Sequence, residues 1–277
     1  MAASIVPLGD FCRKIGGDRV QVTVLIPPGA SPHTYEPPPQ AVARATQAKV
    51  FVYVGAGLDP WAERLAARAG KDQVVVKAVA GLPLFGSPVR GPVEEGPTGP
   101  RRRPRGADRG NPHVWLDPVW AQDICRRLAS AFIQADPSHR QEYDRNLARY
   151  LEELKKLDQE IRCRVAAFTI REFVSFHPSF TYFARRYGLK EVGVIQAAPG
   201  REPTPGQISG IIRAIRKYGV RVVFAEPQLS PRVAQVIAAE AGVRVLLLDP
   251  LGGQPPYGDD YLRLMRWNLD KMEQAMR

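Results

Sequence analysis

The feature that most constrains the fold of this chain is an alternation of strand-like and helix-like runs that occurs twice. In the first half, short β-branched runs lie at 3–6, 20–25, 50–54 and 74–76. In the second half, similar runs lie at 173–176, 192–195, 220–224 and 243–248. Alternation at this spacing predicts, for each half, a parallel sheet with helices on its faces.

A long helical region separates the two halves. After Pro137 and Ser138, a favourable N-cap residue, apolar side chains recur at steps of three and four from Tyr143 to Val165. They indicate a helix of about 30 residues, roughly 45 Å long, which exceeds the width of one small lobe. We therefore expect an α/β fold with two lobes of parallel-type sheets joined by one long rigid helix. The expected division is an N-terminal lobe at 1–137, a linker helix at 138–169 and a C-terminal lobe at 170–277.

The segment 81–111 interrupts the first half with a composition dominated by Gly, Pro and Arg, which predicts a flexible surface loop. It contains the run RRRPRGADR at 101–109, which supplies much of the formal net charge of +11. A basic chain raises nucleic acid as a partner, but no aromatic residue lies within this run to stack on bases. We expect no nucleic acid among the partners, and keep a basic nucleic-acid-binding protein as a second alternative.

Membrane and redox signals are weak. No run approaches the roughly 18 apolar residues of a membrane span, and the first residues, MAASIVPLGDF, lack the pattern of a signal peptide. We expect that an export signal has been removed. The three cysteines, Cys12, Cys125 and Cys163, are far apart and form neither a disulfide framework nor a metal-binding pair of neighbours.

Four side chains stand at positions where ligands bind in α/β folds, beyond the carboxyl ends of strands. His33 lies in the stiff, proline-rich segment IPPGASPHTYEPPP, and His113 lies in NPHVWLDP. His177 in FVSFHPSF and Asp249 in LLLDPLGG each follow a strand-like run. Singly, each is more often a structural residue. Together, three imidazoles and one carboxylate make a tetrahedral ligand set suited to Zn²⁺, with Mn²⁺ also accommodated.

The segments around these residues resemble, in order, four motifs of the metal-binding solute receptors of bacterial ABC importers, the ZnuA/TroA-like family. They are GASPHTYEPPP, NPHVWLDP, SFHPSFTYFARRYGL and LLLDPLGG, and VVFAEPQLSP also matches. The resemblance implies two lobes with the metal in the cleft between them. It assigns His33 and His113 as ligands from the N-terminal lobe and His177 and Asp249 as ligands from the C-terminal lobe.

The same resemblance implies a receptor without enzymatic activity that works as a monomer outside the cytoplasmic membrane. Such a receptor, a periplasmic protein or a lipoprotein, delivers its metal to the membrane permease of an ABC importer. Manganese-selective members tend to carry a carboxylate at the third ligand position, so His177 favours zinc. The chain departs from many zinc-specific members in the loop before His113, which contains no histidine.

Two further possibilities stay open at this point. Glu226 also follows a strand-like run and is either a partner of a ligand or an alternative carboxylate. A zinc-dependent hydrolase is the main alternative function, since three histidines and a carboxylate also hold catalytic zinc. That function would need an open coordination position and a general base, and the sequence contains no H-E-x-x-H helix.

Overall fold

The computed structural model describes residues 1–86, 110–196 and 202–277 and shows two α/β lobes. The sheet of the first lobe has the strand order β2-β1-β3-β4, and every pairing in it is parallel. Its strands are β1 (Ala2–Ala3), β2 (Thr23–Val24), β3 (Val50–Tyr53) and β4 (Val74–Lys77).

The sheet of the second lobe repeats this topology, with the parallel order β6-β5-β7-β8. Its strands are β5 (Glu172–Ser175), β6 (Lys190–Val194), β7 (Val222–Ala225) and β8 (Arg244–Leu247). In both sheets the chain first crosses from the inner strand to one side and then to the other. The order therefore reverses between β1 and β3 and between β5 and β7, and crevices for ligands form at such switch points.

Helices of the first lobe begin where the sequence supplies a proline in the first turn, a position that tolerates its missing N–H. They are α1 (Val6–Gly16), α2 (Pro39–Gln47), α3 (Pro60–Ala66) and α4 (Pro118–Ala135). The N-terminus of α4 is also capped by Asp117, whose side chain accepts a hydrogen bond from the backbone N–H of Val119 at 2.9 Å.

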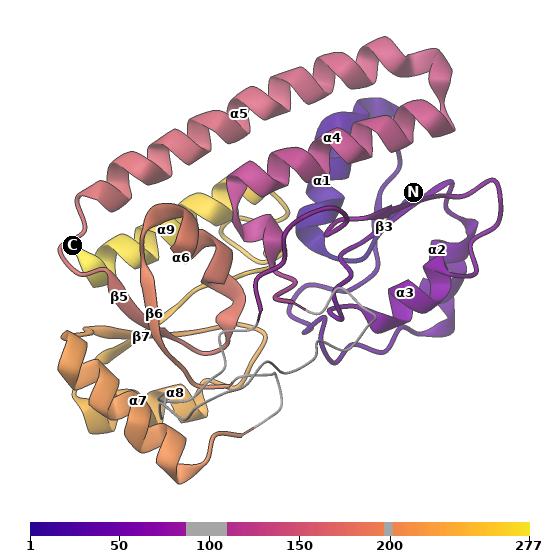
Figure 1. Ribbon diagram of the computed structural model, residues 1–277. Helices are drawn as coiled ribbons and strands as arrows, with labels where there is room; N and C mark the ends of the chain where they lie inside the picture. The colour runs from indigo at the N-terminus through magenta and orange to yellow at the C-terminus, as the bar shows by residue number, and fades with distance from the viewer. Residues whose placement is uncertain (87–109, 197–201) are drawn as a thin grey trace, which may run out of the picture.

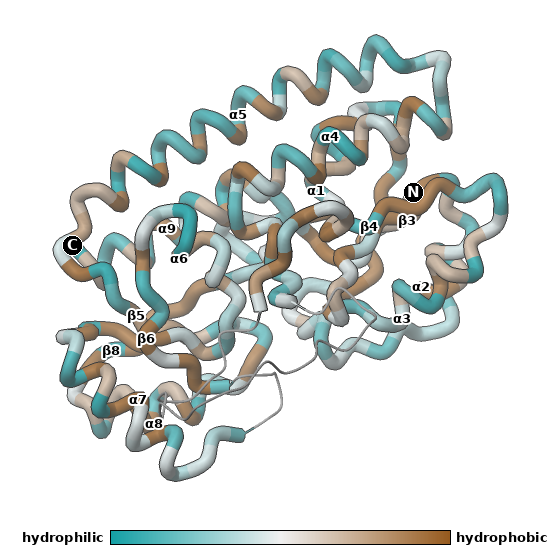
Figure 2. Tube along the Cα trace, viewed as in Figure 1, coloured by the Kyte–Doolittle hydropathy of each residue, from teal (hydrophilic) through white to brown (hydrophobic). Residues whose placement is uncertain are grey.

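The predicted long helix is α5 (Arg140–Ala166), preceded by a short 3₁₀ turn at Pro137–His139, and it runs along both lobes (Figure 1). Most of its predicted apolar stripe is buried, while its outward turns are hydrophilic (Figure 2). The remaining helices are α6 (Thr181–Tyr187), α7 (Pro205–Tyr218), α8 (Arg232–Ala241) and α9 (Tyr261–Met276).

One hydrophobic core extends through both lobes. It includes Phe11 and Trp115 from the first lobe and Phe173, Phe183 and Tyr261 from the second, all at most 1% exposed. A smaller second core lies between the other face of the second sheet and helices α7 and α8. The lobes are thus joined by packed side chains as well as by α5.

The predicted flexible loop 81–111 falls largely on residues 87–109, which lie outside the described residues. Its described ends differ from the expected flexible surface loop, because they pack against the protein. Leu82, Leu84 and Phe85 pack against the main core, and the Phe85 ring lies 5.0 Å from that of Tyr182. Asn111 is 3% exposed. The composition of the whole segment concealed a few apolar residues that anchor its ends.

None of the described helices has the length and apolarity needed to cross a bilayer.

Candidate metal centre

The second sheet brings His177 and Glu226 together at its switch point. His177 follows β5 by two residues, Glu226 follows β7 directly, and β5 pairs with β7. Nδ1 of His177 lies 2.8 Å from Oε1 of Glu226, and the Ser179 hydroxyl donates to the same oxygen at 2.7 Å. Both His177 and Glu226 are 4% exposed. The Glu226 carboxylate therefore fixes the His177 ring through Nδ1 and leaves Nε2 directed toward His113.

His33 comes from the proline-rich segment between β2 and α2. Prolines fix φ and lack a backbone donor, so this segment forms neither helix nor inner strand. The hydroxyl of Tyr35 donates to the carbonyl oxygen of Leu25 at 3.0 Å and closes the segment on itself. The ring of His33 lines the same cavity as His113 and His177.

His113 precedes the 3₁₀ turn η2 (Val114–Leu116) and is 3% exposed. Its Nδ1 lies 2.8 Å from Oδ1 of Asn111. Two residues further on, the indole Nε1 of Trp115 donates to the carbonyl oxygen of Pro250 at 2.7 Å. The segment that carries His113 is therefore tied to the loop that follows β8 in the other lobe.

The Nε2 atoms of the three histidines converge. Nε2 of His113 lies 3.3 Å from Nε2 of His33 and 3.1 Å from Nε2 of His177. In tetrahedral zinc sites with Zn–N bonds of about 2.0–2.1 Å, neighbouring ligand atoms are about 3.3 Å apart, since the edge of a tetrahedron is about 1.6 times the bond length. Among the described residues, these three form the one group whose candidate ligand atoms all lie within 4.8 Å of one another.

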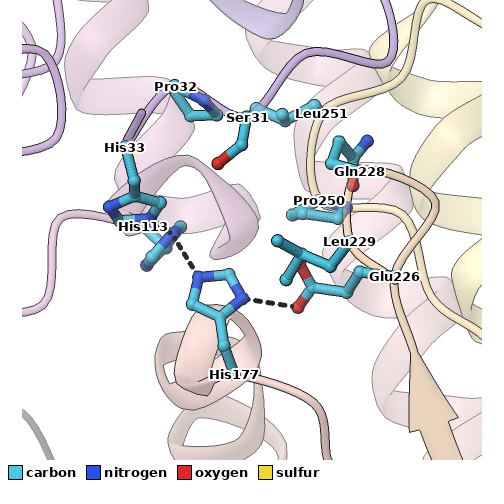
Figure 3. A pocket seen from close by; sticks show the side chains of 10 residues that line it. All are labelled: Ser31, Pro32, His33, His113, His177, Glu226, Gln228, Leu229, Pro250 and Leu251. Carbon is cyan, nitrogen blue, oxygen red and sulfur yellow. Dashed lines mark hydrogen bonds and ion pairs between the residues drawn. The ribbon is translucent and has the colours of Figure 1, made fainter. Parts of the chain in front are cut away.

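The positions of the hydrogens on two of these rings also favour metal binding. Oδ1 of Asn111 and the carboxylate of Glu226 can only accept, so Nδ1 of His113 and Nδ1 of His177 carry the hydrogen. In the neutral rings, Nε2 of each then presents a lone pair, and the two lone pairs meet at 3.1 Å (Figure 3). A cation placed between them removes this repulsion.

Burial keeps two of the rings neutral. It lowers the pKa of His33 to about 3, and the proximity of His177 acts in the same direction. It also lowers the pKa of His113 well below its usual value, with His177 and His33 contributing. Neutral imidazole is the form that binds metal, so at neutral pH protons do not compete for these two ligands.

The carboxylate of Asp249 is not part of the three-histidine group. It is fully buried, and its Oδ1 accepts hydrogen bonds from Nε2 of Gln228 at 2.7 Å and from the backbone N–H groups of Leu251 and Gly252. Its Oδ2 accepts from the hydroxyl of Tyr257 at 2.5 Å. Gln228, its partner on one side, lines the cavity beside the histidines.

The cavity at this site is small, about 10 Å³, which is about the space of one water molecule. Figure 3 shows His33 and His113 on one side of the cavity and Glu226, Gln228, Leu229 and Pro250 across from them. The lining residues are Ser31, Pro32, His33, His113, His177, Glu226, Gln228, Leu229, Pro250 and Leu251. The cavity thus fits a single small ion between the two lobes.

Of the four ligands expected from the sequence, the structure brings the three histidines together, whereas Asp249 lies in a hydrogen-bond network of its own. Sequence reasoning missed the partners of these residues, namely Asn111, Ser179, Gln228 and Tyr257. One of them had a signal. The side chain of Asn111 accepts a hydrogen bond from the backbone N–H of His113 at 3.0 Å. Asn side chains commonly accept from the backbone two residues later in the chain and form a turn in this way. The others depend on loops that meet only in the folded chain.

Comparison with known proteins places the whole chain among zinc-uptake proteins. The family model described as the periplasmic component A of the zinc-uptake complex matches residues 1–275. The high-affinity zinc uptake system protein ZnuA of Bacillus subtilis (strain 168) is 28% identical over 281 residues, covering 100% of this chain and 87% of its own length. The zinc-binding lipoprotein AdcA of Streptococcus pneumoniae (strain ATCC BAA-255 / R6) is 28% identical over 282 residues. The match covers 99% of this chain but 55% of AdcA.

Solved structures agree. A crystal structure of ZnuA has a TM-score of 0.85 and 33% identity to this chain, covering 100% of this chain and 98% of that one. The Zn(II)-bound ZnuA-like domain of Streptococcus pneumoniae AdcA has a TM-score of 0.79 and 26% identity, covering 99% and 97%. The architecture of this chain is therefore shared with a protein domain whose crystal structure contains zinc.

Proposed function

The chain belongs to the family of periplasmic zinc-uptake components, and on that premise we propose that it captures a zinc ion and delivers it to an ABC importer. Zinc is the cargo of this receptor. Relatives named as zinc-binding and zinc-uptake proteins match the chain from end to end. The observation that carries the proposal is the convergence of three imidazole Nε2 atoms at separations typical of tetrahedral zinc.

For the ligands we propose His33, His113 and His177, with Asp249 completing the shell. Oδ2 of Asp249 accepts one hydrogen bond among the described residues and so retains a free lone pair. Gln228, which donates to Oδ1 of Asp249, also lines the cavity, as do Pro250 and Leu251, the two residues after Asp249. Coordination would use this lone pair or replace the hydrogen bond from Tyr257. Manganese is the alternative ion, but imidazole in three of four positions favours zinc.

A receptor fits the site better than a zinc-dependent hydrolase. Pockets that bind small organic molecules usually measure about 300–1,000 Å³, whereas this cavity measures about 10 Å³. Glu226, the nearest candidate for a general base, already accepts from His177 and Ser179. The space admits an ion and no organic substrate beside it.

The proposed place of action is outside the cytoplasmic membrane, with the membrane permease of an importer as partner. This proposal rests on the periplasmic description of the family and on the name lipoprotein that AdcA carries. Because this chain spans about half of AdcA, nothing that belongs to the other half of AdcA is transferred to it.

The ligand assignment is tested by replacing His33 or His177 with Ala and measuring zinc affinity by competition with a chromogenic chelator. Each change should weaken binding by at least tenfold, or about 1.4 kcal/mol, because an imidazole ligand is lost. His139→Ala is the matched control, since this fourth histidine lies beside Asp136 at the start of α5. Wild-type affinity in both ligand variants would refute the assignment.

A further inference from the structure

Asn111 lies outside the cavity, yet its side chain contacts both halves of the histidine cluster. Oδ1 lies 3.0 Å from the backbone N of His113 and 2.8 Å from the Nδ1 of the same residue. Nδ2 lies 2.5 Å from the carbonyl oxygen of Pro178, the residue after His177. One buried amide thus touches a histidine from the first lobe and the loop that carries a histidine from the second.

The orientation of this amide is fixed by its partners. A backbone N–H can only donate and a backbone carbonyl can only accept, so the oxygen must face His113 and the nitrogen must face Pro178. The reversed amide would set donor against donor and acceptor against acceptor. Consequently Nδ1 of His113 has an acceptor as its neighbour and carries the hydrogen, which leaves Nε2 free for the ion.

The backbone of Asn111 is held as firmly as its side chain. Its N–H donates to the carbonyl oxygen of Phe85 at 2.7 Å, and its carbonyl oxygen accepts from the hydroxyl of Tyr182 at 2.7 Å. Tyr182 belongs to α6, which begins shortly after His177. The backbone and the side chain of Asn111 are therefore both tied to the two lobes.

We propose that Asn111 is a positioning residue for zinc, which selects the Nδ1–H tautomer of His113 and holds the His177 loop at the distance that the ion needs. This inference rests on the proposed zinc function. Hydrogen-bond partners of ligating histidines fix the tautomer and ring orientation, and their loss typically costs about 10–100-fold in metal affinity. Here a single amide serves two ligands from different lobes.

Two variants separate the roles of the amide. Asn111→Leu has a similar size but removes both contacts, whereas Asn111→Asp keeps an acceptor for His113 and removes the donor to Pro178. In metal-free protein, ¹H–¹⁵N NMR of the ring nitrogens reports each tautomer, and the chain has only four histidines. The signals of His113 are assigned by their loss in His113→Gln.

Asn111→Leu should give a mixture of His113 tautomers and bind zinc about 10–100-fold more weakly. Asn111→Asp should keep the Nδ1–H tautomer but release zinc about tenfold faster, because the Pro178 carbonyl then faces a carboxylate. Asn146→Leu is the control, since Asn146 makes a comparable amide contact with the carbonyl oxygen of Ile15 away from the site. Both the affinity of this control and its NMR spectrum for His113 should equal those of the wild type.

A leucine variant with an unchanged tautomer would overturn the proposal, even if its zinc affinity falls, because the effect would then be structural. An aspartate variant that releases zinc at the wild-type rate would overturn the role assigned to the Pro178 contact. Failure of the wild-type protein to bind zinc would refute the proposed function instead, and the tautomer measurement in metal-free protein would still decide the role of Asn111 toward His113.

Discussion

Glu226 and His177, 49 residues apart in the sequence, form a buried pair across two neighbouring strands, with 2.8 Å between Oε1 and Nδ1. The carboxylate fixes the ring with its Nε2 toward His113. It also places a carboxylate behind His177, one of the proposed zinc ligands. Both effects should raise the affinity of the site for zinc.

Glu226→Ala should therefore weaken zinc binding by about 10–100-fold, because the His177 ring loses its anchor. Glu226→Gln retains a hydrogen-bond acceptor but no charge, so its zinc affinity should fall by a smaller factor. Competition titration with a zinc chelator measures both variants. Glu240→Ala, a carboxylate removed from the exposed face of α8, serves as the control. Equal affinity in wild type and in Glu226→Ala would show that the pair does not support the site.

Tyr257→Phe tests whether Asp249 can reach the ion. This change removes the hydrogen bond to Oδ2 of Asp249 and frees that oxygen for coordination. Zinc affinity should stay at the wild-type level or rise by a few-fold, whereas Asp249→Ala should lower it by about tenfold or more, about 1.4 kcal/mol. Isothermal titration compares the three proteins. If Asp249→Ala binds zinc as the wild type does, the shell contains no Asp249.

Acid should destabilise the metal-free protein through His33 and His113. The pKa of His33 is about 3 in the folded state and about 6.5 in the unfolded chain. Between these values the unfolded state binds more protons, so the free energy of unfolding is highest above pH 6.5 and falls as pH decreases toward 3. His113 contributes in the same direction.

The expected slope from one such histidine is about 1.4 kcal/mol per pH unit. Urea unfolding with a chelator present, between pH 5 and 8, should show a shallower pH dependence for His33→Gln than for the wild type. His139→Gln is the control, since His139 lies partly exposed beside Asp136. Identical slopes in wild type and His33→Gln would mean that the His33 ring is already accessible to protons in the folded state.

Asp10 should produce the opposite trend. Its carboxylate accepts from the backbone N–H of Tyr261, and burial raises its pKa to about 6. Between about pH 4 and 6 the folded state binds more protons than the unfolded state, so the free energy of unfolding falls as pH rises through this window. Asp10→Asn should therefore be more stable than the wild type at pH 8, by on the order of 2 kcal/mol, and no more stable near pH 4.

Thermal and urea unfolding at both pH values check this expectation. Asp18→Asn, in the short 3₁₀ turn that follows α1, is a control at an exposed carboxylate. A stabilisation of Asp10→Asn that is the same at pH 4 and pH 8 would indicate that the charge of Asp10 is not its cause.

Much of the fold was predictable because its signals are local. The apolar stripe of α5 follows from helical spacing. The ends of α7 carry local signals too, with a capping box at Thr204, Pro205 in the first turn and a left-handed C-cap at Gly219. Boundaries were less predictable. The run 3–6 looked like a strand, but β1 ends at Ala3 and α1 begins at Val6, with Pro7 in its first turn, while Ile5 keeps an extended backbone as the N-cap residue.

The sequence indicated candidate residues for the site but not how they lie relative to one another. Strand ends identified His177, Glu226 and Asp249, since carboxyl ends of parallel strands gather at one edge of a sheet. Which of the two carboxylates lies behind a histidine depends on strand order, and β5 pairs with β7 rather than with β8. The contacts of Asn111 with Pro178 and of Trp115 with Pro250 join segments from different lobes, so no local pattern announces them.

The continuous core beneath both lobes limits how an ion can leave. Parting the lobes would expose large side chains such as Trp115, Phe183 and Tyr261 to water, and each costs about 1.5–3 kcal/mol or more when its apolar surface is fully exposed. The segment that carries His33 packs at the edge of this core and is only partly buried. The residence time of zinc should then be governed by local opening of the segment that carries His33. Substitutions in this segment, rather than in α5, should change the rate at which zinc is released.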